Sequence, residues 1–472
     1  MKMRRLRFLF YIIVVILPVF LVRCANIVPP DGGPKDTIPP VLVKAIPPDS
    51  SLHFHSRLIT LNFDEYIQLQ GLTDQLVYTP TSLRQPQIIS KFRTLTIQLN
   101  DTLKPNTTYT LNFGNAIRDL DEGNPINDFR YIFSTGSYLD SLSISGKVDY
   151  AQTGLPDSNI VIMLYQDLSD SVVSKQKPVY YTRSDGKGHF KLENLPHGEF
   201  KLFALKDQSN ALAYIDSTEF IAFINNPIQL NRDTGGVHLY LFAESSAPAK
   251  NSGPPNLLTP PSGRLVKKKQ LRWIGVNPRV GSGGLDITGP LIISLDQQVR
   301  TLDTSKLHLQ EDTSYTPVNA LVSLDSTGTL VSVTKKWDED MLYRLVLDSG
   351  FVKDSSGVYN RQDTIDFRTK SSSDYGSIIL RFKNLDSLKH YVVQIVSNNL
   401  IKYTGPLLGN IWRKDMVEPG TYEIRVLVDR NNNGIWDNGR YYGGKKQPEH
   451  VIAIPQQIEI RESWENRMNV SL

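Results

Sequence analysis

The sequence predicts an all-β protein built of tandem β-sandwiches, and three observations lead to this fold class. Many short segments alternate apolar and polar residues, as Ile59, Leu61 and Phe63 do, and this period of two is typical of half-buried strands. Turn-forming residues separate the segments at short spacing, and no segment has the periodicity of an amphipathic helix. Segments of the first half also recur in the same order in the second half.

The composition indicates a folded chain held together by apolar cores. Of the 472 residues, 40% are hydrophobic and 21% are charged, as in ordinary globular proteins. The formal net charge is +4 with both signs interspersed, so we expect no nucleic-acid partner and no polyanionic substrate. Cys24 is the single cysteine, which excludes internal disulfides, and thiol catalysis or cysteine-ligated metal in the rest of the chain.

The N-terminus has the pattern of an export signal. Lys2 and three arginines precede an apolar run from Phe8 to Val22, which is short for a bilayer span. A cysteine that would become the first mature residue resembles the start of bacterial lipoproteins, whose thiol is acylated after cleavage. This resemblance implies a membrane-lipid anchor at Cys24. An uncleaved membrane anchor fits the same pattern, and Arg23 stands where lipoproteins usually have a small residue.

The chain divides into an A–B–A′–B′ duplication. Gly198–Asp207 recurs as Gly420–Asp429, and the pair Tyr109 and Phe133 has counterparts at Tyr343 and Phe367. Pro, Gly and Ser are concentrated in two stretches that we expect to be extended connections. The expected order is a signal peptide at 1–23, a Pro/Gly tether at 24–40, segment A at 41–136, segment B at 140–243, a linker at 244–264, segment A′ at 265–371 and segment B′ at 375–472.

Three stretches of segment A carry a family resemblance. They are ITLNFD at Ile59–Asp64, LKPNTTY at Leu103–Tyr109 and FSTG at Phe133–Gly136. Their order and spacing resemble the bacterial Ig-like domain first described in surface-layer proteins. Segment A′ is similar to the same domain in a degenerate form.

Segment B carries a second resemblance. The stretches ISGKV at Ile144–Val148, RSDGKGHF at Arg183–Phe190 and LPHGEF at Leu195–Phe200 resemble the transthyretin-like, carboxypeptidase-regulatory-like domain. Segment B′ keeps the last of these pieces. With GGPKD at Gly32–Asp36, the whole arrangement is similar to Ig-like-domain lipoproteins of Bacteroidota. The resemblance implies an outer-membrane location, on a face that the sequence does not decide.

A short tripeptide beginning with Asp resembles the O-glycosylation site of exported proteins in that group. Polar turns and strand edges of β-proteins contain the same residues, so both interpretations stand. The candidate acceptors are Thr37, Thr102, Ser141, Ser171, Ser217, Ser326, Thr364 and Ser387.

A loop after Gly420–Asp429 is a candidate calcium site. Oxygen-bearing residues follow one another at alternate positions with Gly434 at the sixth, as in a calcium loop. Position twelve is Arg440 instead of the usual bidentate Glu. The alternative is an Asn-Gly β-turn that leads into a strand at Ile435-Trp436. The candidate ligands are Asp429, Asn431, Asn433, Ile435 through its carbonyl, and Asp437.

Three further clusters have simpler interpretations. Asp119, with Asp121 and Glu122, is expected to form a structural turn. His53 and His55 would share one face of a strand, where a metal would lack a third ligand, so an exposed edge strand is favoured. A basic cluster borders the linker, and a solvated linker end is favoured over contact with anionic lipid or an acidic partner. This cluster comprises Arg264, Lys267, Lys268, Lys269, Arg272 and the adjacent Trp273.

These observations favour a protein that binds and does not catalyse. The chain has no Gly-x-Ser-x-Gly elbow, His-Glu-x-x-His, phosphate loop or dinucleotide fingerprint. We expect a scaffold or binding subunit of an outer-membrane complex, with outer-membrane protein assembly among the implied roles. Its expected partners are envelope proteins, without a small-molecule substrate or any cofactor other than calcium. The alternatives are a surface glycan-binding or adhesion lipoprotein, for which exposed Trp residues would line one face, and a hydrolase.

Overall fold

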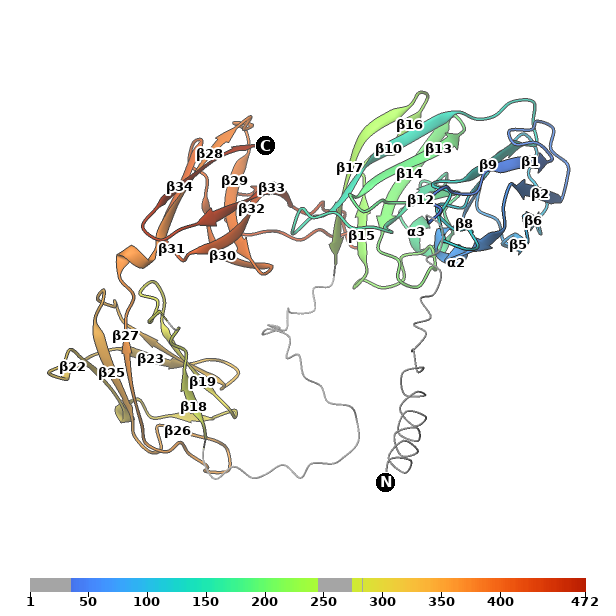
Figure 1. The fold of residues 1–472 in the computed structure, drawn as a ribbon. Coiled ribbons are helices and arrows are strands. Elements are labelled where there is room, and N and C mark those ends of the chain that lie inside the picture. Colours follow the sequence, from blue (N-terminus) through green and yellow to red (C-terminus); the bar gives the residue numbers. More distant parts are fainter. Residues whose placement is uncertain (1–34, 245–273, 282) are drawn as a thin grey trace, which may run out of the picture. The chain divides into compact units, whose positions relative to one another are not determined.

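The computed structural model describes residues 35–244, 274–281 and 283–472, and these residues fold almost entirely as β-strands (Figure 1). The predicted fold class is therefore confirmed. The chain forms two compact units, Met1–Ser141 and Leu142–Leu472. Within the described residues, no helix has both the length and the apolar character needed to cross a membrane.

The first unit is a β-sandwich with segment A as its core. One sheet has the order β1-β2-β6-β5, a second has the order β4-β7-β9, and β3 pairs with β8. Tyr109 of β7 lies opposite Phe133 of β9, and their rings stack with centroids 5.2 Å apart. The elements are β1 Leu42–Ile46, β2 Leu58–Phe63, β3 Ile67–Leu69, the short helix α2 Leu72–Gln75, β4 Val77–Thr79, β5 Gln87–Lys91, β6 Thr94–Gln98, β7 Thr108–Asn112, β8 Ile117–Asp119 and β9 Arg130–Ser134.

One local prediction in this unit is wrong. His53 and His55 lie outside the strands, in the bend and loop before β2. The backbone at His53 has a φ of 50°, and Phe54 between the two histidines is buried against Phe133. The backbone N–H of Phe54 also donates to the backbone oxygen of Ser134 at 2.9 Å, so hydrogen bonds to the end of β9 and packing of the Phe54 ring together fix this stretch.

Segment B begins the second unit. Strand β10 pairs in parallel with β17 and antiparallel with β13, while β11, β12, β14 and β15 continue the sheet and β16 pairs with β14. The elements are β10 Leu142–Tyr150, β11 Val161–Tyr165, the short helix α3 Val172–Lys175, β12 Tyr180–Arg183, β13 His189–Leu195, β14 Gly198–Leu205, β15 Phe220–Phe223, β16 Ile228–Leu230 and β17 Thr234–Ala243.

Segment A′ has the strand order of the first unit with one strand added. The order β18-β19-β24-β23 corresponds to β1-β2-β6-β5, and β21-β25-β27 corresponds to β4-β7-β9, whereas β22 has no counterpart. Tyr343 and Phe367 pair across β25 and β27 and stack at 5.7 Å. The strands are β18 Val276–Pro278, β19 Leu291–Leu295, β20 Thr301–Leu302, β21 Leu307–Glu311, β22 Thr316–Val318, β23 Leu321–Leu324, β24 Leu330–Thr334, β25 Leu342–Leu347, β26 Val352–Lys353 and β27 Asp363–Arg368.

Segment B′ has the pairing pattern of segment B. Strand β28 pairs in parallel with β34 and antiparallel with β31, as β10 does with β17 and β13. The other sheet has the order β30-β29-β32-β33, and a long loop joins β32 to β33. The strands are β28 Gly376–Lys383, β29 His390–Ser397, β30 Leu400–Pro406, β31 Ile411–Val417, β32 Gly420–Asp429, β33 His450–Ile460 and β34 Glu465–Ser471.

A large hydrophobic core lies in each of the segments A, B, A′ and B′. In β2, for example, Ile59, Leu61 and Phe63 are buried while the residues between them are less buried. Burial of one such side chain contributes about 1.5–3 kcal/mol. The alternation seen in the sequence therefore corresponds to strands with one face on a core.

Candidate functional site

The predicted calcium loop begins at a buried carboxylate. Asp429 ends β32 and is 1% exposed. Its Oδ1 accepts a hydrogen bond from the backbone N–H of Asn433 at 3.3 Å, and its Oδ2 accepts one from Gly434 at 2.7 Å. Gly434 has a φ of 80°, which favours glycine at this position. The local sequence thus gives a turn closed by its first side chain.

The other candidate ligands also serve the loop. The Asn433 side-chain oxygen accepts from the N–H of Ile435 at 2.9 Å, and the Asn431 amide donates to the Asp437 carboxylate. Within the described residues, no group of three or more His, Cys, Asp or Glu side chains is placed to hold a metal ion. Calcium binding here stays a prediction. Ile435-Trp436 does not form the strand that the turn alternative requires, because the chain continues as a loop to His450.

Sequence reasoning missed Glu449, which organises the other side of this loop. Glu449 is 2% exposed, and its carboxylate accepts the backbone N–H of Arg430 at 2.7 Å and that of Asp437 at 3.0 Å. A buried carboxylate is stable only where such donors replace water. No spacing rule connects Glu449 with Asp429, so the sequence offered no indication of this role.

The same loop then docks onto segment B within the second unit. We name residues 438–447 the Tyr441 loop. Tyr441 is 3% exposed, and its ring lies edge-on to Phe203 at 5.6 Å and to Phe223 at 5.0 Å. Its hydroxyl donates to the backbone oxygen of Asp170 at 2.6 Å. A buried aromatic ring with a satisfied hydroxyl is a strong anchor between two surfaces.

Polar contacts surround this anchor. The Glu244 carboxylate accepts the backbone N–H groups of Tyr441 and Tyr442, and it also accepts the hydroxyl of Tyr214 at 2.8 Å. Asp170 pairs with Lys445, and with Lys201 of segment B. Hydrogen bonds from these two lysines lower the pKa of Asp170. Glu244 stands at the start of the expected linker, yet it is part of this contact.

A histidine–tyrosine stack lies at the same contact. The ring of Tyr240 stacks on His238 at 4.4 Å and on His450 at 4.3 Å. His238 Nε2 lies 2.7 Å from the Asp149 carboxylate. Burial, together with the nearby charges of Arg430 and His238, lowers the pKa of His450 to about 4. His450 is therefore neutral at pH 7 and stacks as an uncharged ring.

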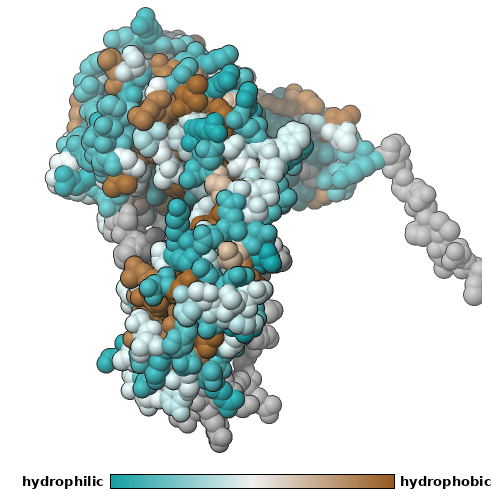
Figure 2. Space-filling model, turned by 90° about the vertical axis from the view of Figure 1, so that its left-hand side faces the viewer, coloured by the Kyte–Doolittle hydropathy of each residue, from teal (hydrophilic) through white to brown (hydrophobic). Residues whose placement is uncertain are grey.

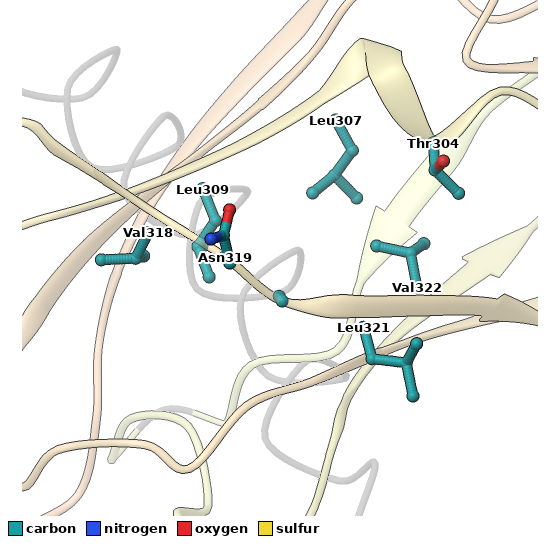
Figure 3. A pocket seen from close by; sticks show the side chains of 8 residues that line it. Thr304, Leu307, Leu309, Val318, Asn319, Leu321 and Val322 are labelled. Atoms are coloured by element: carbon teal, nitrogen blue, oxygen red, sulfur yellow. The ribbon is translucent and has the colours of Figure 1, made fainter.

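Segment A′ contains an open hollow with a volume of about 300 Å³. It lies where the edge strands β22 and β23, which belong to different sheets, are joined by Asn319 and Ala320. In Figure 3, Val322 lies on the same side of its strand as Leu307 and Thr304. Polar atoms and apolar side chains both line it, and the lining residues are Thr304, Leu307, Leu309, Val318, Asn319, Ala320, Leu321 and Val322.

Most of the predicted glycosylation acceptors are accessible. Ser171 is half-buried and the remaining seven are exposed, which agrees both with modification and with simple polar turns. The exposed acceptors are Thr37, Thr102, Ser141, Ser217, Ser326, Thr364 and Ser387. Cys24 and the basic cluster at Arg264–Trp273 lie outside the described residues.

The acidic loop at Asp119 is a turn, as the sequence predicts. Asp119 is 1% exposed, and its carboxylate accepts the backbone N–H groups of Glu122, Gly123 and Asn124 at 2.6–3.0 Å. These hydrogen bonds lower the pKa of Asp119 against the opposing effect of burial. The negative charge of Asp119 therefore stabilises the loop through these hydrogen bonds.

Comparisons with solved structures show only distant similarity. The major pilin subunit BcpA of Bacillus cereus is 12% identical over 69% of this chain and 99% of that chain, with a TM-score of 0.16. The TIE protein of Bacillus anthracis is 10% identical over 94% of this chain and 75% of that chain, with a TM-score of 0.16. The N-terminal part of the bacterial S-layer protein SbsC is 14% identical over 44% of each chain, with a TM-score of 0.16. Such low TM-scores carry no argument about function.

Family and curated-protein comparisons give one positive result. A search of curated proteins finds no match. Residues 36–135 match the family described as the bacterial Ig-like domain. This match agrees with the motifs of segment A and with its two-sheet sandwich. The first sandwich of this chain is therefore a bacterial Ig-like domain.

Proposed function

We propose that the protein is a non-catalytic lipoprotein, anchored in the outer membrane through acylated Cys24, that serves as a scaffold or binding subunit of a cell-envelope complex. The lipoprotein-like N-terminus and the Ig-like domain at residues 36–135 support this proposal. Assembly of outer-membrane proteins is one such role. Three buried carboxylates also support it, because Asp119, Asp429 and Glu449 accept backbone N–H groups and so have structural roles.

The hollow in segment A′ is the observation that carries the binding role. Two sheet edges end beside it, and Leu321 of β23 is 72% exposed. Proteins usually protect such edges, because a second chain can pair with their free backbone groups. The backbone of an added strand would hydrogen-bond to β23, and one of its side chains would enter the hollow. On the face shown in Figure 2, hydrophobic patches lie among hydrophilic residues. Exposed hydrophobic patches bordered by polar residues are typical of surfaces that bind another molecule.

Photo-crosslinking tests this role in native envelopes. A photoreactive amino acid replaces exposed Asn319 at the hollow, and the matched control replaces exposed Ser355 elsewhere in segment A′. We expect a discrete adduct from position 319 that mass spectrometry of gently extracted membranes identifies as an envelope protein. Equal labelling from both positions, or isolation of the protein as a lone monomer, would contradict the proposal.

Lipid attachment needs a separate measurement. Metabolic labelling with a fatty acid is expected to mark the protein, and Cys24→Ser is expected to remove the label and release the protein from the membrane fraction. Because Cys24 is the single cysteine, no other thiol can account for labelling. Label retained by the Cys24→Ser variant would contradict the anchor.

The glycan-binding alternative gains no support from the tryptophans that the structure describes. Trp337 and Trp412 are buried in cores of different segments, and Trp436 is half-buried. Trp464 is 62% exposed, but none of the other described tryptophans is exposed beside it. A platform of stacked sugars requires at least two exposed rings on one face.

A further inference from the structure

One hairpin of the Ig-like domain carries an aromatic residue that folding does not explain. Lys91 of β5 pairs with Thr94 of β6, so Phe92 and Arg93 form a two-residue loop. Phe92 has a φ of 57°, a conformation that bulky side chains rarely adopt and that favours glycine at the first position of such loops. Its side chain is 66% exposed and gains little from burial. A strained and exposed aromatic residue indicates a contact with something else.

An exposed aromatic ring lies beside Phe92, and an exposed leucine directly follows the strand that pairs with this part of the chain. Tyr66 is 49% exposed, and its ring centroid is 6.0 Å from that of Phe92. Leu120 is 52% exposed, and its N–H donates to the backbone oxygen of Tyr66 at 3.0 Å. The N–H of Ile67 donates to the backbone oxygen of Phe92 at 2.9 Å. We name Tyr66, Phe92 and Leu120 the Phe92 tip.

Charges of both signs border the Phe92 tip. The Lys91 ammonium lies 5.8 Å from the Phe92 ring centroid, and the Arg93 guanidinium lies 5.3 Å from that of Tyr66. The carboxylate of Glu65 precedes Tyr66, and burial with nearby carboxylates, including Asp119, raises its pKa. The border therefore carries both cations and carboxylates. It suits a surface that itself carries paired positive and negative groups.

The N-terminal chain meets the domain at the same end. The backbone oxygen of Asp36 accepts a hydrogen bond from the Asn124 side chain at 3.1 Å, and Asn124 lies in the loop that follows Leu120. Cys24 and Asp36 are twelve positions apart in the chain, a length that reaches at most roughly 40 Å when extended. A bilayer that holds Cys24 would therefore be within reach of the Phe92 tip.

We propose that the Phe92 tip inserts into the headgroup layer of a zwitterionic phospholipid bilayer. Aromatic side chains favour this layer, because it accepts an apolar ring beside polar groups. Lys91 and Arg93 meet the lipid phosphate, and the carboxylate of Glu65 meets the ammonium of a headgroup such as ethanolamine. The proposal rests on the proposed lipid anchor for its choice of surface.

Segment A′ offers an internal control for this inference. Its β23–β24 hairpin corresponds in strand order to β5–β6, and its loop has Gly328 at a φ of 70° and an exposed Ser326. In this hairpin the residue with a positive φ is a glycine, whereas in the β5–β6 hairpin it is Phe92. The β23–β24 loop is longer, at residues 325–329, and the contrast shows that a hairpin at this place in the strand order does not require an exposed aromatic ring.

The test uses the full mature chain with Cys24→Ser and an N-terminal His tag, bound to phosphatidylethanolamine and phosphatidylcholine vesicles that contain nickel-chelating lipid. This attachment makes the test independent of acylation. A result that contradicts insertion of the Phe92 tip can therefore be distinguished from a result that contradicts acylation of Cys24. A polarity-sensitive dye is placed on Phe92→Cys or, as the control, on Ser326→Cys. We expect blue-shifted emission and quenching by nitroxide lipids at position 92 only. In the Phe92→Cys chain, Tyr66→Ser with Leu120→Ser is expected to lower that quenching at least twofold while circular dichroism stays unchanged.

Each other outcome overturns a stated part of the proposal. Equal emission and quenching at positions 92 and 326 would exclude lipid insertion. Protection of the dye at position 92 by envelope proteins but not by vesicles would make the tip a protein-binding surface. Quenching that appears only after phosphatidylglycerol is added would replace the zwitterionic lipid by an anionic one.

Discussion

Asp207 and Asp429 make the same pair of hydrogen bonds at corresponding ends of segments B and B′. Each Oδ1 accepts the backbone N–H four residues later at 3.3 Å, from Ala211 and Asn433 respectively. Each Oδ2 accepts the N–H five residues later at 2.7 Å, from Leu212 and Gly434. The recurring stretches Gly198–Asp207 and Gly420–Asp429 thus share a turn as well as a strand.

This relationship predicts similar costs for the two carboxylates. Asp207→Ala and Asp429→Ala each remove two hydrogen bonds from backbone N–H groups to a buried carboxylate, which costs about 1–3 kcal/mol. We expect both variants to lower the Tm of the full chain by comparable amounts. A lower Tm for only one of the two variants would show that the two turns are not equivalent.

Calcium titration then separates the two roles of Asp429. A calcium site predicts a Tm that rises in millimolar calcium and an effect that Asp429→Ala abolishes. A purely structural turn predicts no shift in either chain. Asp207→Ala is the matched control, because its loop lacks the run of asparagines at 431–433.

The docking of the Tyr441 loop predicts a graded response to substitution. Tyr441→Ala removes a buried ring and is expected to cost about 3 kcal/mol, whereas Tyr441→Phe removes only the hydrogen bond to Asp170, about 1 kcal/mol. Hydrogen exchange should become faster in residues 438–447 of the alanine variant. Tyr442, which is 43% exposed, provides the control. Equal effects of Tyr441→Ala and Tyr442→Ala would contradict the anchor role.

His450 predicts a loss of stability in mild acid. Its pKa is lowered from 6.5 to about 4 by burial and nearby positive charge, so the unfolded chain binds a proton more readily. The contribution is fully present above pH 6.5 and is lost as the pH falls through 4. His450→Phe keeps the stack on Tyr240 without titrating, so its Tm should fall less between pH 7 and 4.5. If the Tm of the His450→Phe variant and that of the unaltered chain fell equally with pH, His450 would be excluded as the source of the acid sensitivity.

Phe92 predicts a substitution that helps folding and harms binding. Phe92→Gly relieves a positive φ, which costs about 1 kcal/mol for a bulky residue, so the Tm should stay equal or rise. In the Phe92→Gly variant, contact between the Phe92 tip and lipid vesicles should decrease. A clear drop in Tm would show that the ring stabilises the hairpin.

The sequence shows the strands better than the contacts between them. Alternation at Ile59, Leu61 and Phe63 reports burial directly, and the motifs of segment A identify an Ig-like domain. By contrast, Tyr441 stands among Gly and Lys residues typical of an exposed turn, and only tertiary packing buries it.

The candidate sites show the same limit. Periodicity does not report φ or exposure, so Phe92 cannot be recognised as a strained tip from the sequence. Glu449 acts on Arg430 and Asp437 across a long loop, and local spacing rules do not reach that far. Asp429 could be recognised as the start of a loop motif, but the amide partners of its carboxylate could not.

Crosslinking from the hollow of segment A′ in native envelopes tests the binding role most directly. We expect a discrete adduct with one envelope protein from position 319 and none from position 355. The isosteric substitutions Val318→Thr and Val322→Thr together should reduce the yield of that adduct. Position 319 labelling no more than position 355, in envelopes where the protein is anchored and folded, would contradict a binding subunit that uses this edge.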